Sequence, residues 1–188
     1  MKRLVTYVAS VLLAGTISAI PAAAQHEQHA DRVVQPGPAG QDRIAKEVRH
    51  ELVTLPYYGV FDDLEYSVSG NAVTLIGSVT RPTLKSDAEN AVRHIEGVER
   101  VDNKIEVLPL SPMDDHTRIA EYRAIYGQPG LDRYALQAVP PIHIIVDSGH
   151  VTLVGVVASQ GDKDLAGIRA NTVSGVFSVD NKLRVERK

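Results

Sequence analysis

The chain has 188 residues, with 20 Lys and Arg against 23 Asp and Glu, which gives a net charge of -3. This balance argues against bulk attraction to nucleic acid, and any attraction to an anionic membrane would have to come from a local basic patch. Cysteine is absent, which excludes disulfides and cysteine-linked lipid anchors, so packing alone must hold the fold together.

The N-terminal residues have the order of a secretion signal. Lys2 and Arg3 precede an apolar stretch up to Ile20, and a proline and three alanines follow. We therefore expect cleavage after Ala24 and a periplasmic mature protein. The alternative is an uncleaved membrane anchor, but the apolar stretch is at the short limit for a bilayer span and ends in a helix-breaking proline.

Residues 25–40 are rich in polar residues, Pro and Gly, which predicts a disordered segment. A helix is expected next, over 43–54, because Ile44, Val48 and Leu52 form one apolar stripe at helical spacing.

A β-hairpin follows this helix. Apolar residues alternate over 64–68 and again over 73–77, and Gly70 and Asn71 between them mark a tight turn. Pro82 suits the first turn of a second helix. A closing strand is expected over 101–107.

This order completes a first module, 41–109, and we expect 110–116 to be a linker to a second module at 117–188. The second module should contain a helix at 118–126, strands at 142–146 and 151–157, a helix near 162–173 and a strand at 177–185. Its loop 127–141 is longer than the equivalent in the first module. Extra loop length is often where function lies.

The two modules are copies of one pattern. Shifting the chain by 78 positions aligns 73–107 with 151–185 without gaps, and 14 of the 35 pairs are identical. The sequence therefore predicts an α+β fold of two tandem α-β-β-α-β modules, each a three-stranded sheet packed on two helices. The bare face of each sheet would need another partner.

Both copies resemble BON domains, the module of osmotically inducible periplasmic proteins. The resemblance rests on Val-Thr-Leu-x-Gly-x-Val at 73–79 and 151–157, and on Gly-Val-x-x-Val-Asp-Asn-Lys at 97–104 and 175–182. It covers nearly all of the mature chain. It implies adhesion to phospholipid or other envelope components, without a shared catalytic centre, and it implies that the second copy's first helix and nearby loops face the membrane.

The candidate lipid-binding residues lie on that helix and in the long loop. They are Tyr122, Arg123, Tyr126, Leu131, Arg133 and Tyr134. Tyrosine prefers a water–lipid boundary, and arginine can pair bidentately with phosphate. The alternative is that Tyr122 and Tyr126, one helical turn apart, belong to the stripe that packs on the sheet.

Other candidate sites have simpler explanations. The repeated glycines, such as Gly77 and Gly155, are expected to relieve backbone restrictions or allow close packing instead of cradling phosphate. His26 and His29 lack a third ordered ligand, so no metal and no cofactor is predicted. Clustered carboxylates such as Asp62 and Asp114 suit turns and helix caps. No hydrolase motif is present, so we do not expect an enzyme.

Two hypotheses follow for the partner. In the first, a non-enzymatic envelope protein binds phospholipid headgroups and supports envelope integrity under stress, as in osmotic stress. In the second, it is a protein-interaction or chaperone-like adaptor that uses an exposed sheet face or edge strand to bind envelope proteins.

Overall fold

The computed structural model describes residues 38–186. The predicted signal peptide, and the predicted disordered segment up to residue 37, lie outside the described residues. Within the described part of the chain, no helix is both long enough and apolar enough to span a membrane.

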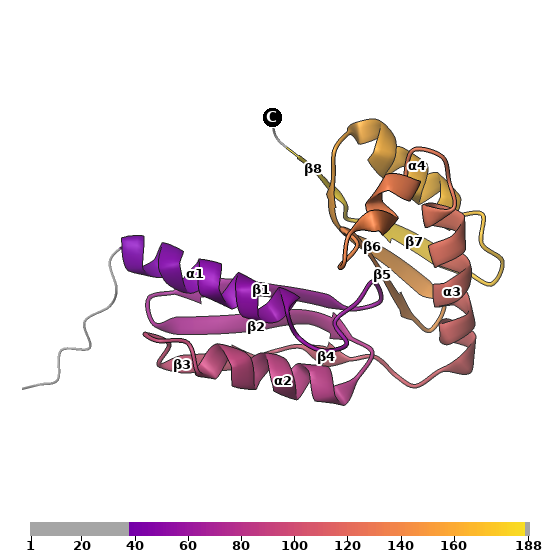
Figure 1. Cartoon of the computed structure of the whole chain (residues 1–188). Coiled ribbons are helices and arrows are strands. Elements are labelled where there is room, and N and C mark those ends of the chain that lie inside the picture. The colour runs from indigo at the N-terminus through magenta and orange to yellow at the C-terminus, as the bar shows by residue number, and fades with distance from the viewer. Residues whose placement is uncertain (1–37, 187–188) are drawn as a thin grey trace, which may run out of the picture. The chain divides into compact units, whose positions relative to one another are not determined.

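The first module has the predicted α-β-β-α-β order (Figure 1). Its elements are α1 Pro38–Val53, β1 Asp63–Ser69, β2 Ala72–Val79, α2 Pro82–Arg93, β3 Arg100–Asn103 and β4 Glu106–Val107. The central strand, β2, pairs antiparallel with β1 and parallel with β3 and β4. The sheet is therefore mixed, and the α+β prediction is confirmed.

The second module repeats this arrangement with one added 3-10 helix. Its elements are α3 Pro112–Tyr126, η1 Asp132–Leu136, β5 Ile142–Asp147, β6 His150–Val157, α4 Gln160–Ala170, β7 Ser178–Asn181 and β8 Arg184–Val185. Strand β6 is central, antiparallel to β5 and parallel to β7 and β8.

The final strand of each module is broken in two by an asparagine. Asn103 Oδ1 accepts a hydrogen bond from the Ile105 N–H at 3.1 Å, and Asn103 Nδ2 donates to the Lys85 carbonyl on α2 at 3.0 Å. Asn181 makes the same two bonds in the second module. These bonds compete with the strand ladder, so the repeated Asp-Asn-Lys motif marks a break in the closing strand.

Two predicted boundaries were wrong. Helix α3 begins at Pro112, so most of the predicted linker 110–116 is the first turn of this helix. Ser111 caps the helix, since its hydroxyl accepts from the Asp114 N–H at 3.2 Å. A serine followed by proline at the first helical position is a common helix start. The same residue pair also suits a linker, which is what the sequence predicted here. Helix α1 likewise begins at Pro38, within the segment predicted to be disordered.

Each module has its own hydrophobic core, built from one sheet face and two helices. In the first module the buried residues include Val48 from α1, Leu75 from β2 and Leu84 from α2. In the second they include Ile125 from α3, Ile144 from β5 and Leu153 from β6. Only one face of each strand contributes, as the alternation of side chains requires.

Glycine in the middle of each central strand permits a close approach of the backbone. Gly77 and Gly155 have φ values of +119° and +121°, a region that L side chains rarely adopt. A Cβ on Gly155 would lie 1.9 Å from the Pro141 carbonyl oxygen. The predicted structural role of these repeated glycines is confirmed.

Candidate functional site

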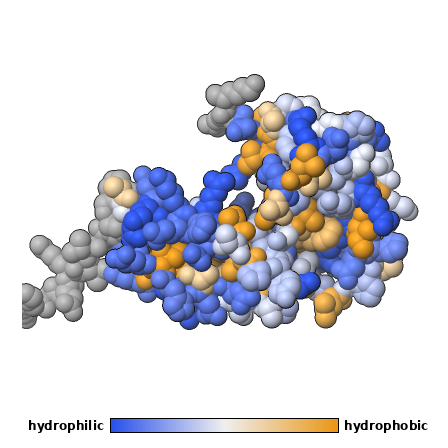
Figure 2. Space-filling view, in the orientation of Figure 1, coloured by the Kyte–Doolittle hydropathy of each residue, from blue (hydrophilic) through white to orange (hydrophobic). Residues whose placement is uncertain are grey.

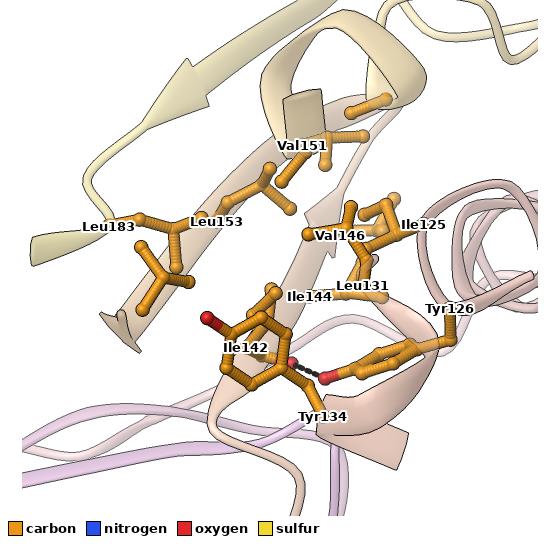
Figure 3. Packing of buried hydrophobic residues seen from close by; sticks show 13 residues of the cluster. Ile125, Tyr126, Leu131, Tyr134, Ile142, Ile144, Val146, Val151, Leu153 and Leu183 are labelled. Carbon is orange, nitrogen blue, oxygen red and sulfur yellow. Dashed lines mark hydrogen bonds between the residues drawn. The ribbon is translucent and has the colours of Figure 1, made fainter. Parts of the chain in front are cut away.

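Three of the six candidate lipid-binding residues are buried in the core of the second module. Tyr126, Leu131 and Tyr134 are buried and pack in its hydrophobic core, where Figure 3 shows the two rings among the strand residues. The Tyr126 hydroxyl donates to the Ile142 carbonyl at 2.5 Å. These three side chains therefore hold the helix and the long loop to the sheet, and the surface reading of them is corrected.

Arg133 is exposed but is engaged in a polar network with the same loop. Its Nη2 donates to Asp162 Oδ2 at 2.6 Å, and its guanidinium lies over the Tyr134 ring. Asp162 Oδ2 also accepts from the Tyr134 hydroxyl at 3.0 Å and from the Ser159 hydroxyl at 2.7 Å. The network ties η1 to the N-terminus of α4.

The electrostatics of this network favour an ionised carboxylate. Burial alone would raise the pKa of Asp162, but hydrogen bonds from Ser159 and Tyr134, together with Arg133, hold the pKa below its usual value. Asp162 therefore stays charged and paired at neutral pH, and it has a structural role at the start of α4.

The remaining two candidates, on α3, differ in their exposure. Arg123 is exposed, and Tyr122 is half-buried between the rings of Tyr126 and Phe61. Arg123 is therefore the candidate that is most available to a ligand. Tyr122 can contribute only part of its ring.

The outer face of α3 exposes further side chains that are not among the six predicted candidates. Met113 is 75% exposed and Ile119 is 47% exposed, and His116 and Arg123 are also exposed. Positions 116, 119 and 123 follow helical spacing, so they lie along one face. Figure 2 shows that hydrophobic side chains interrupt the polar surface in several separate places. The sequence did not indicate this face, because the predicted helix began at 118 and Met113 fell in the predicted linker.

The edge strand of the second sheet is closed by side chains and by the segment before β1. The outward carbonyls of β5 accept hydrogen bonds from α3, with Tyr126 bonded to Ile142 and Arg118 Nη2 bonded to Val146 at 2.7 Å. The Ile144 N–H donates to the Val60 carbonyl at 2.8 Å. Because edge strands recruit other chains through free backbone groups, this closure makes β5 a poor docking edge.

Acidic side chains proposed for turns and caps have those roles. Asp62 accepts from the Thr80 N–H at 2.7 Å and from the Gly59 N–H at 3.2 Å. Asp114 accepts from the N–H groups of Ser148 and Gly149, at 3.0 and 2.9 Å. Within residues 38–186, no group of three or more His, Asp or Glu side chains is arranged to hold a metal ion; His26 and His29 lie outside the described residues.

The fold and this surface define a class of small duplicated α+β modules that carry a mixed sheet under two helices. The chain belongs to the BON domain family, whose model matches residues 41–109 and 131–187. The second match begins at residue 131, so it includes η1 and most of the loop between α3 and β5. Helix α3 itself lies between the two matched segments and outside both of them.

Two solved structures of a structural protein of the type III secretion system of Chlamydia trachomatis, CdsD, are similar to this chain. The alignment with the first structure spans 77% of this chain and 92% of the CdsD chain, with 11% identity and a TM-score of 0.31. The other, its C-terminal domain, covers 76% and 96%, with 11% identity and a TM-score of 0.27. The comparison with curated proteins found no match.

Proposed function

We propose that the protein is a periplasmic, non-enzymatic envelope protein whose second module binds phospholipid at a membrane surface through the outer face of α3. The proposal draws on the membership of the BON family and on the family's association with phospholipid and membrane binding. Support of envelope integrity under stress would be the physiological consequence.

The exposed apolar and cationic side chains of α3 are the observation that carries the proposal. Met113 and Ile119 offer apolar groups to the acyl boundary, and Arg123 offers a guanidinium to a lipid phosphate. The helix beneath them is fixed, because its inner face is buried and Tyr126 and Arg118 bond it to β5. The surface is therefore prearranged, and binding would not have to order it.

Vesicle flotation of residues 25–188 tests this proposal. We expect the protein to float with vesicles of phosphatidylcholine and phosphatidylglycerol at low salt, and less with phosphatidylcholine alone. Arg123→Glu should reduce flotation with the anionic vesicles at least several-fold, because it replaces an attractive charge with a repulsive one at the lipid surface.

A matched control is Lys46→Glu on α1, which makes the same change of charge at an exposed position of the first module. This variant should float like the unmodified protein. Equal loss in both variants would show that net charge controls binding and that α3 does not. Absence of flotation with anionic vesicles at low salt would contradict the proposal itself.

An adaptor that captures a partner strand on β5 is less well supported. Three of the outward backbone groups of this strand already have partners from Arg118, Tyr126 and Val60. A partner strand would have to displace these bonds first, at a cost in free energy.

A further inference from the structure

One carboxyl group in the second module is fully buried and lacks any hydrogen-bond partner. Glu121 is 0% exposed, and both of its Oε atoms are inaccessible and unbonded within the described residues. A buried charged carboxylate without partners is very costly, whereas its protonated form costs much less. Most surface helices avoid this arrangement, so its presence in the middle of α3 requires an explanation.

The first module shows what this position holds when it is purely structural. The buried stripe of α1 is Ile44, Val48 and Leu52, and the corresponding buried positions of α3 are Thr117, Glu121 and Ile125. In both helices the last member lies one residue before the helix end. Glu121 therefore occupies the position of Val48, which is 0% exposed.

The groups that face this region do not neutralise Glu121. On α3, Arg118 bonds to Asp115 and to the Val146 carbonyl, Asp114 bonds to the β5–β6 turn, and Tyr126 bonds to β5. On α4, Asp162 is paired with Arg133, and it also accepts from Tyr134 of η1.

Arg169 of α4 has a buried Nε without a partner, but no ion pair joins it to Glu121 in the described residues. The β5 residues that face the helix, Ile142, Ile144 and Val146, are apolar. No group from these elements therefore offers Glu121 a charge partner or a hydrogen bond.

We propose that Glu121 makes the packing of α3 on β5 depend on pH. The helix packs on the strand while this carboxyl is neutral, and it detaches more readily when the carboxyl ionises in alkaline solution. Loosening would break the bonds from Arg118 and Tyr126 and uncover the edge of β5. This pH dependence does not require that the outer face of α3 binds lipid.

The direction of the effect follows from linkage. Burial raises the pKa of Glu121 to about 8, from an ordinary value of 4.5. In the folded second module the carboxyl stays mostly protonated up to about pH 8. Its contribution to stability is fully present below about pH 4.5 and is lost as pH rises through about 8. Between these values the folding equilibrium constant of the second module should fall about tenfold per pH unit.

Hydrogen exchange measured by mass spectrometry on residues 25–188 tests this at several pH values from 6 to 9. After correction for intrinsic exchange, peptides from α3 should lose protection as pH rises. Peptides from α1, with Val48 at the equivalent position, should not. Glu121→Val and Glu121→Gln should each keep α3 protected at pH 9, because neither side chain can ionise.

An independent measurement covers the case in which a variant folds poorly. Carbon-13 NMR of the glutamate carboxyl groups, with the Glu121 signal assigned by its absence in Glu121→Gln, should give a pKa well above 4.5. A Glu121 carboxyl that ionises near 4.5, or equal loss of α3 protection in the wild type and the valine variant, would overturn the proposal.

Discussion

The hydroxyl of Tyr134 joins three segments of the second module. It donates to Asp162 Oδ2 at 3.0 Å and accepts from the Ala158 N–H at 2.8 Å, and its ring packs in the core. Residue types alone suggested a lipid contact here, because tyrosine and arginine suit both a headgroup and a loop anchor. What decides between them is burial, which depends on the path of the loop.

We expect Tyr134→Phe to lower the free energy of unfolding by about 1 to 2 kcal/mol, because the hydroxyl's bonds with Asp162, Ala158 and Arg133 are lost while the ring is kept. Flotation with anionic vesicles should be unchanged. Urea unfolding measures the first effect. The control is Tyr57→Phe, whose ring is 71% exposed and which should be neutral. A variant that keeps its stability but no longer binds vesicles would restore Tyr134 to the lipid site.

At the scale of elements, the repeated pattern predicted most of the fold. Alternation over 64–68 and 73–77 was sufficient for the hairpin, and the 78-residue shift transferred it to the second module. Helix starts were harder, because a serine-proline pair before α3 is compatible with both a linker and a cap. The burial of Glu121 could not be predicted either, since a glutamate on a helix is usually exposed.

Asp114 anchors the start of α3 to the β5–β6 turn. Burial alone would raise its pKa, but the N–H groups of Gly149 and Ser148, the Ser111 hydroxyl and Arg118 hold the pKa below its usual value of 3.8. A lowered pKa means that its contribution to stability is present above about pH 3.8 and is lost as pH falls further. Ionisation of Asp114 therefore stabilises the second module, whereas ionisation of Glu121 is proposed to destabilise it.

We therefore expect Asp114→Asn to destabilise the protein by about 1 to 3 kcal/mol at pH 7, because its charge-assisted bonds from the Ser148 and Gly149 N–H groups are weakened. The difference from the wild type should shrink as pH falls below about 4. Thermal unfolding followed by circular dichroism across this range measures it. Asp87→Asn, at an exposed position of α2, is the control. A constant difference at all pH values would contradict a role for the ionised carboxylate.

At the scale of the whole molecule, charge opposes attraction to an anionic membrane. Lys2 and Arg3 are the only charged residues before Gln25, so the predicted mature chain keeps 18 basic and 23 acidic residues. Binding to anionic lipid must then come from a local surface whose short-range attraction exceeds a repulsive overall field. Both contributions are screened by salt, but the apolar contacts of Met113 and Ile119 are not.

Because the apolar contacts are not screened, salt should weaken membrane binding without abolishing it. When salt is raised from about 0.05 to about 0.5 M, flotation of the wild type with anionic vesicles should fall, and part of it should persist because the apolar contacts are unscreened. The double variant Met113→Ser and Ile119→Ser should lose the persistent part and keep much of the low-salt binding. Because both side chains are exposed, these changes should leave the urea unfolding midpoint nearly unchanged. Complete loss of wild-type binding at high salt would mean that only charge attaches the second module to the membrane.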